Sequence, residues 1–315
     1  MFAQRLGVVL AVLAAGMSSG CDVVALLGGF PKPTITTRSS LPVELAYRAG
    51  SDGLVILTGR VNGRVDDEFI LDTGAPVTVL IANAHTAPLG FDTSKARRLG
   101  PADDPASPTG VIERDLALTF GDVALTGLAA VMLPESTLAC PERFREVGFE
   151  GVIGADLFRR FVVDVDPARQ RVTLHEPATW TPPSGAAVVP IRLESGHAYI
   201  DATLVLSGGE RVTLPLHVDT GMTTALALVG GSHPSLAMPT QGEVTRSCFV
   251  SGRREVRRGL PVGVRLGTAA FDGVAPRFAE KRDVPSVQQA GAVGSGLLST
   301  RRYVIDYPGK RLVVL

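Results

Sequence analysis

Two copies of one acidic turn are the residues best placed to do chemistry. Residues 71–74 read LDTG and residues 218–221 read VDTG, and each turn follows an apolar run. Two facing carboxyl groups can act as base and acid, because one takes a proton from water while the other, still protonated, polarises a carbonyl group. We therefore expect Asp72 and Asp219 to meet and share a proton, since two adjacent carboxyl groups cannot both ionise.

An internal repeat predicts how the two turns are brought together. Residues 151–174 align without a gap on residues 291–314 at a constant offset of 140 positions. Upstream of the turns, residues 53–74 and 198–221 both read as a strand, a hairpin turn with glycine and a second strand. The chain is therefore expected to form two duplicated lobes. Short helical patterns occur only in PERFREV (141–147), GADLFRRF (154–161) and SGLLSTRR (295–302).

The composition favours the same architecture. Glycine (35) and proline (22) are plentiful and aromatic residues make up only 5% of the chain, which is typical of many short strands joined by turns. The 31 basic and 31 acidic side chains cancel, so no net charge would steer the protein toward nucleic acid. An all-β protein that does not bind nucleic acid is expected.

Each lobe joins an apolar strand that ends in Asp-Thr-Gly to a later apolar segment that ends in glycine, VIG at 152–154 and AVG at 292–294. One such turn would be weak evidence, because Asp-Thr-Gly is good turn chemistry in any β protein. Two copies, each with its partner segment, resemble the pepsin and retropepsin family of aspartic peptidases. Residues 42–315 resemble the bacterial two-lobed aspartyl-protease-family lipoproteins. The resemblance implies an all-β fold of two duplicated pepsin-like or retropepsin-like β-barrel lobes with a cleft between them.

The resemblance also implies a function and roles for the residues of the turns. It implies an aspartic endopeptidase that hydrolyses cell-envelope proteins or peptides with water activated between the two aspartates, without a metal or another cofactor. Thr73 and Thr220 would brace the site, each hydroxyl bonding to the loop of the other lobe. Gly74 and Gly221 would let the backbone turn tightly beside the carboxyl groups. Retroviral relatives build this site by homodimerisation, whereas this chain carries both halves, so a monomer is expected.

Some features differ from the best-known members of that family. Pepsin-like enzymes usually place serine or threonine after the Asp-Thr-Gly turn, where this chain has Ala75 and Met222. Alanine also occurs in the retroviral relatives, but methionine is less usual, although Thr223 is adjacent. The candidate flap, residues 103–115, contains no tyrosine. An alternative interpretation is a non-catalytic peptide-binding or scaffolding protein that retains the fold.

The N-terminal residues look like an export signal. Arg5 precedes an apolar run that is too short to span a bilayer, and the sequence SSGC ends at Cys21. This segment resembles a bacterial lipoprotein signal, which implies a lipidated Cys21 at the mature N-terminus; an ordinary cleaved signal and an uncleaved anchor are the alternatives. Asp22 resembles the signal for retention in the inner membrane. We therefore expect a lipid-anchored protein of the cell envelope, on the periplasmic face of the inner membrane.

The divisions of the chain follow from these patterns. The stretch between the lobes is rich in Pro, Thr, Ser and Gly and is typical of a linker. The predicted divisions are a signal peptide at 1–21, a tether at 22–41, an N-terminal lobe at 42–174, a linker at 175–187 and a C-terminal lobe at 188–315.

The remaining candidate groups have less specific interpretations. Once Cys21 is lipidated, Cys140 and Cys248 form either a disulfide or two separate buried thiols. The run RREVRR at 253–258 is expected to be a solvated hairpin rather than a patch for lipid or an acidic substrate. The histidines show no metal-ligand spacing, so we expect no metal site and interpret them as surface or strand residues. They are His85, His175, His197, His217 and His233.

Overall fold

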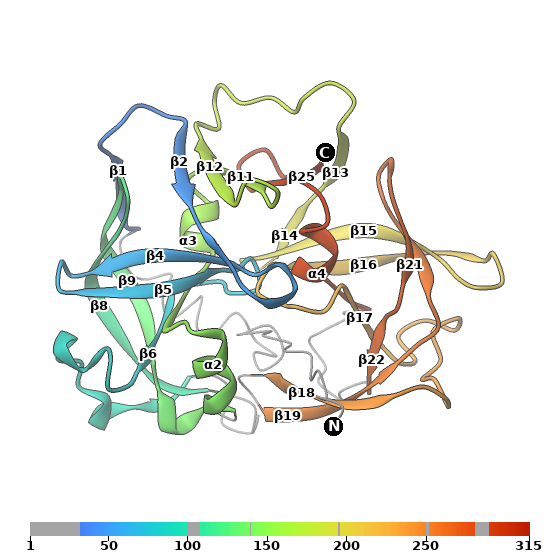
Figure 1. The fold of residues 1–315 in the computed structure, drawn as a ribbon, viewed down its shortest axis with the longest axis horizontal. Helices are drawn as coiled ribbons and strands as arrows, with labels where there is room; N and C mark the ends of the chain where they lie inside the picture. The colour runs from blue at the N-terminus through green and yellow to red at the C-terminus, as the bar shows by residue number, and fades with distance from the viewer. Residues whose placement is uncertain (1–31, 100–107, 139, 195, 250–251, 281–289) are drawn as a thin grey trace.

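The protein is built almost entirely from β-strands. Strands account for 52% of the residues and helices for 10%, which confirms the prediction of an all-β protein with two duplicated lobes (Figure 1). The predicted signal with Cys21 lies outside the described residues. No helix in the described part of the chain is long and apolar enough to cross a membrane. The computed structural model describes residues 32–315 except for 100–107, 139, 195, 250–251 and 281–289.

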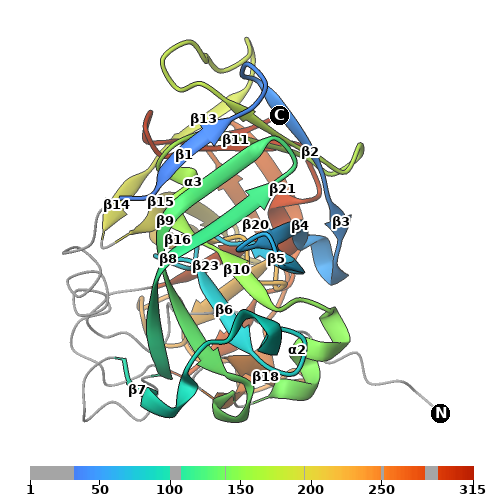
Figure 2. The ribbon, with the colours of Figure 1, turned by 90° about the vertical axis from the view of Figure 1, so that its left-hand side faces the viewer.

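A nine-stranded sheet forms the first lobe. The order of its strands is β1-β9-β6-β10-β5-β4-β8-β7, with β3 paired to β4 and a further pairing of β8 with β9. Strand β5 lies between β10 and β4, and its last three residues are all buried, as expected for a strand covered on both faces. Figure 2 shows β8 and β9 as the long strands that face the viewer. The strands are β1 (Thr34–Thr37), β3 (Arg48–Ala49), β4 (Val55–Val61), β5 (Val65–Leu71), β6 (Val79–Ala82), β7 (Arg97–Arg98), β8 (Thr109–Phe120), β9 (Val123–Pro134) and β10 (Gly151–Ile153).

A ten-stranded sheet forms the second lobe. Its order is β18-β19-β22-β17-β23-β16-β15-β20-β21, with β14 paired to β15. The predicted basic hairpin is present, because RREVRR lies in β19 and pairs antiparallel with β18. The strands are β14 (Arg192–Glu194), β15 (His197–Val205), β16 (Arg211–Asp219), β17 (Leu226–Val229), β18 (Val244–Phe249), β19 (Gly252–Arg258), β20 (Val262–Leu266), β21 (Ala269–Val274), β22 (Arg277–Ala279) and β23 (Gly291–Gly294).

A six-stranded sheet, at the top of Figure 1, joins the lobes. At its centre β11 pairs antiparallel with β24, and Asp164 lies opposite Val304. These two residues are equivalent under the 140-residue repeat, so a pseudo-twofold axis passes between them. The order is β13-β25-β24-β11-β12-β2. The strands are β2 (Val43–Ala46), β11 (Val162–Asp166), β12 (Arg171–His175), β13 (Ala187–Pro190), β24 (Tyr303–Asp306) and β25 (Arg311–Val314).

The same strand register recurs in both lobes. Strand β10 runs parallel to β5 with Val152 opposite Ile70, and β23 runs parallel to β16 with Ala292 opposite His217. Val152 and Ala292 are related by the offset of 140 positions, and Ile70 and His217 by the 147 positions that separate Asp72 from Asp219. Each lobe therefore places its apolar-glycine segment beside the strand that ends in the acidic turn.

Helices are few and short in the described part of the chain, where the predicted helical segments are confirmed. The α-helices are α2 (Pro141–Val147), α3 (Ala155–Phe158) and α4 (Ser295–Leu298). Short 3-10 turns are η1 (Ser51–Gly53), η2 (Ala87–Leu89), η3 (Thr93–Lys95) and η4 (Glu135–Thr137).

Apolar side chains of both lobes belong to one continuous core. Phe158 of the first lobe packs on Tyr307 of the second, with 5.4 Å between the ring centroids. Burying a side chain of this size contributes about 2–3 kcal/mol. The lobes are therefore held together by hydrophobic contact as well as by their shared sheet.

A covalent bond also connects the lobes. Cys140, just before α2, forms a disulfide with Cys248 of β18, and their Cα atoms lie 6.2 Å apart. Of the two alternatives for these cysteines, the structure contains the bridge. Arg253 Nη2 donates to Glu142 Oε1 at 2.6 Å next to it. Because the bond encloses a loop with a sequence separation of 108, the chain-entropy model assigns it about 4–5 kcal/mol.

Candidate active site

The two acidic turns are held by the strands beside them. Asp72 follows the last residue of β5, and its backbone N donates to Ile153 O of β10 at 3.0 Å. Asp219 is the last residue of β16 and lies opposite Gly294 of β23. Both aspartates are almost fully buried, with exposed fractions of 0% and 1%. In each lobe the neighbouring parallel strand therefore fixes the backbone position from which the aspartate side chain extends.

Hydrogen bonds between the threonines lock the two turns face to face. Thr73 N donates to Thr220 Oγ1 at 3.0 Å, and Thr220 N donates to Thr73 Oγ1 at 3.1 Å. Each hydroxyl then donates to a backbone carbonyl of the opposite lobe: Thr73 Oγ1 to Val218 O at 2.6 Å, and Thr220 Oγ1 to Leu71 O at 2.8 Å. The arrangement is symmetric, and it places the two threonines as the resemblance implied.

Removing one of these hydroxyls should destabilise the fold. In Thr73→Val, the Val218 carbonyl and the Thr220 amide lose their buried partner, and an unsatisfied buried group costs about 1–3 kcal/mol. We expect the free energy of unfolding to fall by about 3 kcal/mol in a denaturant titration. The matched control is Thr203→Val, which loses only the exposed hydroxyl pair with Thr213. Equal stability losses in the two variants would contradict the proposed locking role.

The carboxyl groups meet between the turns. Asp72 Oδ1 accepts hydrogen bonds from Gly74 N at 2.6 Å and from Gly221 N, in the opposite turn, at 3.0 Å. A Cβ atom added at Gly74 would lie 2.7 Å from Asp219 Oδ1 and 2.9 Å from Asp72 Oδ1. These two oxygens therefore flank a single point, so the two carboxyl groups lie close enough for each to affect the pKa of the other.

The environment gives the two acids different protonation states. Burial raises the pKa of Asp72 to about 6, although the amides of Gly74 and Gly221 and the hydrogen bond from Asp219 lower it. Burial raises the pKa of Asp219 well above its usual range, and the charge of Asp72 raises it further. The two backbone amides that donate to Asp72 Oδ1 favour the negative charge on Asp72 and the shared proton on Asp219. One group can accept a proton while the other donates one.

Residues 57–157 match the family model for aspartyl proteases. The match runs from β4 to α3 and so contains the first acidic turn and the segment that supports it. A search of curated proteins found no match. The family match and the nearly all-β fold agree with a two-lobed pepsin-like architecture, and they support a general aspartic protease function.

The residues that follow the turns differ from the pepsin-like pattern of such proteases. Ala75 and Met222 are both buried, and their carbonyl oxygens accept from the backbone N of Ala155 at 2.9 Å and of Ser295 at 2.8 Å, respectively. The hydroxyl of Thr223, the adjacent alternative, has no hydrogen-bond partner among the described residues. These positions therefore support the turns through their backbone, and none of the three side chains donates to the acid pair.

A pair of buried histidines distinguishes the second lobe of this protease-like fold from the first. His197 of β15 and His217 of β16 stack edge to face with 5.1 Å between ring centroids. Burial lowers the pKa of both, that of His197 to about 4, so both rings are neutral near pH 7. By strand register, the equivalent positions of the first lobe are Leu54 and Ile70, which are apolar. Sequence analysis interpreted these histidines as surface or strand residues and did not predict that they are buried; the apolar Ile70 at the position equivalent to His217 was the available signal.

The other predicted positions lie apart from the acid pair or outside the described residues. Cys21 is outside them, as is the part of the candidate flap at 103–107. The rest of the flap segment from Thr109 belongs to β8, which pairs with β7 and β9. The disulfide of Cys140 and Cys248 lies between α2 and β18.

Proposed function

We propose that the protein is an aspartic endopeptidase that hydrolyses peptide bonds of cell-envelope proteins or peptides. The observation that carries this proposal is the pair of buried carboxyl groups, Asp72 and Asp219, that the two turns bring together, with two backbone amides donating to Asp72. The family match to aspartyl proteases over the first lobe supports it. Since both acids come from one chain, a monomer is sufficient for the reaction.

The pair can perform the hydrolysis without a further reagent. Asp72 takes a proton from water as the oxygen of that water bonds to the scissile carbonyl carbon, and Asp219 gives its proton to the carbonyl oxygen. The resulting diol collapses with cleavage of the carbon–nitrogen bond. The nitrogen then takes the proton from Asp72, and a diol hydroxyl returns a proton to Asp219. The amides of Gly74 and Gly221 hold the Asp72 carboxylate in place.

The second candidate function is that of a non-catalytic peptide-binding or scaffolding protein. It is favoured by Met222 and by the Thr223 hydroxyl, which has no partner in the described part of the chain. Against it, a binding protein has no need for two acids buried together, because such a pair lowers stability through desolvation and repulsion.

Cleavage of an unfolded protein by the mature chain, residues 21–315, distinguishes the two functions. We expect new peptide fragments in mass spectra, and we expect a statine-type transition-state inhibitor to suppress them. The inhibitor controls for a contaminating protease of another class. Fragments that persist at saturating inhibitor, or no fragments with any of several unfolded substrates between about pH 4 and 8, would favour the binding protein.

The pH dependence of hydrolysis should be bell-shaped, with its maximum above pH 6. Activity falls at low pH because Asp72, whose pKa burial raises to about 6, becomes protonated. It falls at high pH when Asp219 loses its proton, and burial together with the Asp72 charge moves that loss well above the usual carboxyl range. Measurements of kcat/KM across pH test this profile.

Hydroxyls introduced after the turns should shift the upper limb of that profile. In Ala75→Ser and Met222→Thr, a new donor would stabilise the charged pair and lower its pKa, so activity should be lost at lower pH than in the wild type. An upper limb that moves to higher pH in these variants would contradict proton sharing between the aspartates.

We also propose that lipidated Cys21 anchors the protein to the periplasmic face of the inner membrane, in line with the signal-like residues around it. In Cys21→Ser, we expect the protein to move from the membrane fraction to the soluble fraction, because lipidation requires the thiol. A control variant, Ser19→Ala, keeps a small residue before the cysteine. Membrane association that is equal in wild type and Cys21→Ser would refute the lipid anchor.

A further inference from the structure

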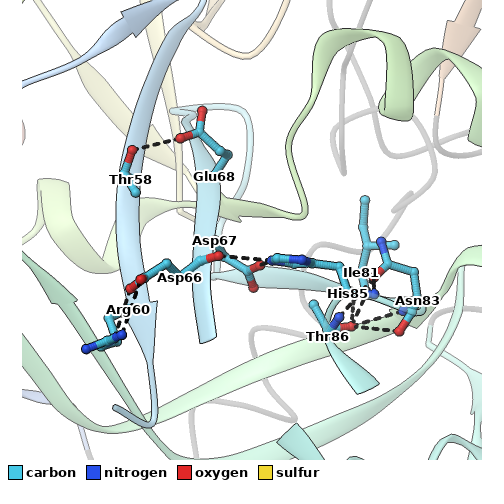
Figure 3. A network of polar contacts seen from close by, with 9 residues as sticks. All are labelled: Thr58, Arg60, Asp66, Asp67, Glu68, Ile81, Asn83, His85 and Thr86. Atoms are coloured by element: carbon cyan, nitrogen blue, oxygen red, sulfur yellow. Dashed lines mark hydrogen bonds and ion pairs between the residues drawn. The ribbon is translucent and has the colours of Figure 1, made fainter. Parts of the chain in front are cut away.

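Three potential metal ligands from distant parts of the sequence meet at one end of the first-lobe sheet. Asp67 lies on β5, His85 follows β6, and Glu150 directly precedes β10. Strand β10 lies between β5 and β6, which brings the three together. One ligand atom from each residue lies within 4.8 Å of the other two. Figure 3 shows the His85 ring pointing at Asp67.

The backbone beside β10 fixes Glu150 at this end of the sheet. Glu150 N donates to Glu68 O of β5 at 3.0 Å, and Ile81 N of β6 donates to Glu150 O at 2.7 Å. The backbone of Glu150 is thus hydrogen-bonded to both neighbouring strands. The backbone from which its carboxyl side chain extends is therefore held by the sheet rather than carried on a free loop.

The carboxyl group of Asp67 is buried but has few hydrogen-bond partners. Its side chain is fully buried, and its Oδ2 atom has no hydrogen-bond donor among the described residues. Its close contact is the ion pair of Oδ1 with His85 Nε2 at 2.8 Å. A buried carboxylate without donors is costly unless a positive charge lies beside it.

The imidazole nitrogen is surrounded by oxygen atoms. His85 Nε2 lies 2.9 Å from the backbone oxygen of Asp66 in addition to its contact with Asp67. Three atoms with lone pairs therefore converge, and either a proton on Nε2 or a cation must lie between them.

The turn that carries the histidine is rigidly built. Asn83 Oδ1 accepts hydrogen bonds from His85 N at 2.9 Å and from Thr86 N at 3.1 Å. Thr86 Oγ1 donates to Ile81 O, at the β6 end, at 2.8 Å. This network, visible in Figure 3, holds the imidazole over Asp67, as outer hydrogen bonds do for metal ligands.

We propose that Asp67, His85 and Glu150 bind one divalent cation of the zinc class. An imidazole nitrogen with two carboxylate oxygens is a donor set that zinc prefers, whereas calcium and magnesium prefer oxygen ligands alone. Zinc bonds of about 2.0–2.2 Å place tetrahedral ligand atoms roughly 3.4 Å apart. The His85 side chain is 51% exposed and its Nε2 atom lies 2.8 Å from Asp67 Oδ1, so it is free to move the roughly 0.6 Å that this spacing requires.

The cation would have a structural role and is independent of the proposed peptidase chemistry. Asp67 precedes Asp72 by five positions along an extended chain, which corresponds to about 16 Å. The ion would tie together β5, β6 and β10, the strands that position the first acidic turn. The spacing of these ligands along the sequence matches no metal motif, which explains why no metal was expected.

The test is a calorimetric titration of metal-free protein with zinc chloride at neutral pH. We expect one ion per chain, and we expect Asp67→Asn and His85→Gln each to weaken binding about 100-fold. The matched controls are Glu68→Gln, whose carboxyl group bonds to Thr58, and His233→Gln. Both should bind zinc within about threefold of wild type, because neither residue contributes a ligand.

The alternative is a protonated His85 that forms an ion pair with Asp67 and binds no metal. The absence of zinc binding to the wild type, or binding that is unchanged in both ligand variants, would establish that alternative. Tighter binding of calcium than of zinc would overturn the assignment to the zinc class. Should Asp67→Asn fail to fold, His85→Gln decides, because the half-exposed ring can be replaced without a buried cavity, and its melting temperature should not rise with zinc.

Discussion

Replacing Asp72 or Asp219 with asparagine should lower kcat/KM for peptide hydrolysis by on the order of 10⁴-fold. Each acid has a separate task, since Asp72 carries the charge and Asp219 the proton. Neither can substitute for the other. The shape of the side chain is kept, so circular dichroism should show a folded protein in both variants.

The double variant provides the control for this prediction. Two groups that act as a unit give non-additive losses, so Asp72→Asn combined with Asp219→Asn should be little worse than either single change. Asp201→Asn, at an exposed position paired with Arg192, should retain wild-type activity. Wild-type turnover in either single variant would show that the acid pair is not catalytic.

Gly221→Ala should lower kcat/KM by on the order of 10³-fold, because the added methyl group displaces Asp72. A Cβ atom at this position would lie 2.4 Å from Asp72 Cγ and 2.5 Å from its Oδ2. The carboxyl group would have to move, and it would lose the hydrogen bond from Gly221 N. Small displacements of catalytic groups are costly, because the reacting atoms must be aligned.

The control is Gly208→Ala, where a Cβ atom would meet no described atom within 4 Å. This variant should have wild-type kinetics. Measuring kcat and KM for both variants, together with a thermal melt, separates a displaced carboxyl group from a damaged fold. Unchanged kinetics in Gly221→Ala would show that the site tolerates a displaced Asp72 carboxyl group and that catalysis does not require a tightly positioned acid pair.

The two-lobed architecture could be predicted because the sequence contains an internal repeat. The constant offset between Gly154 and Gly294 indicated duplicated lobes, and the structure adds that the offset also preserves strand register. Periodicity in strands and turns depends on neighbouring residues, so it can be read locally. The helices at 141–147, 155–158 and 295–298 were predictable for the same reason.

Features that depend on distant contacts could not be predicted in the same way. The sequence left two states open for Cys140 and Cys248, because bridging depends on how closely the fold brings their Cα atoms. The cluster of Asp67, His85 and Glu150 has no regular spacing and arises from the order of three strands. The six-stranded sheet that joins the lobes was likewise not predicted, since pairing between lobes leaves no local signal.

The six-stranded sheet also determines when the molecule can finish folding. Strand β13, which begins the second lobe, pairs with β25 at the very end of the described chain, and β11 of the first lobe pairs with β24. Contacts between residues so distant in sequence form slowly, because the intervening chain must first be ordered. Almost the whole chain must therefore reach the compartment in which it folds before the central layer can close. Until then the first lobe has an open sheet edge at β11, which favours aggregation during folding.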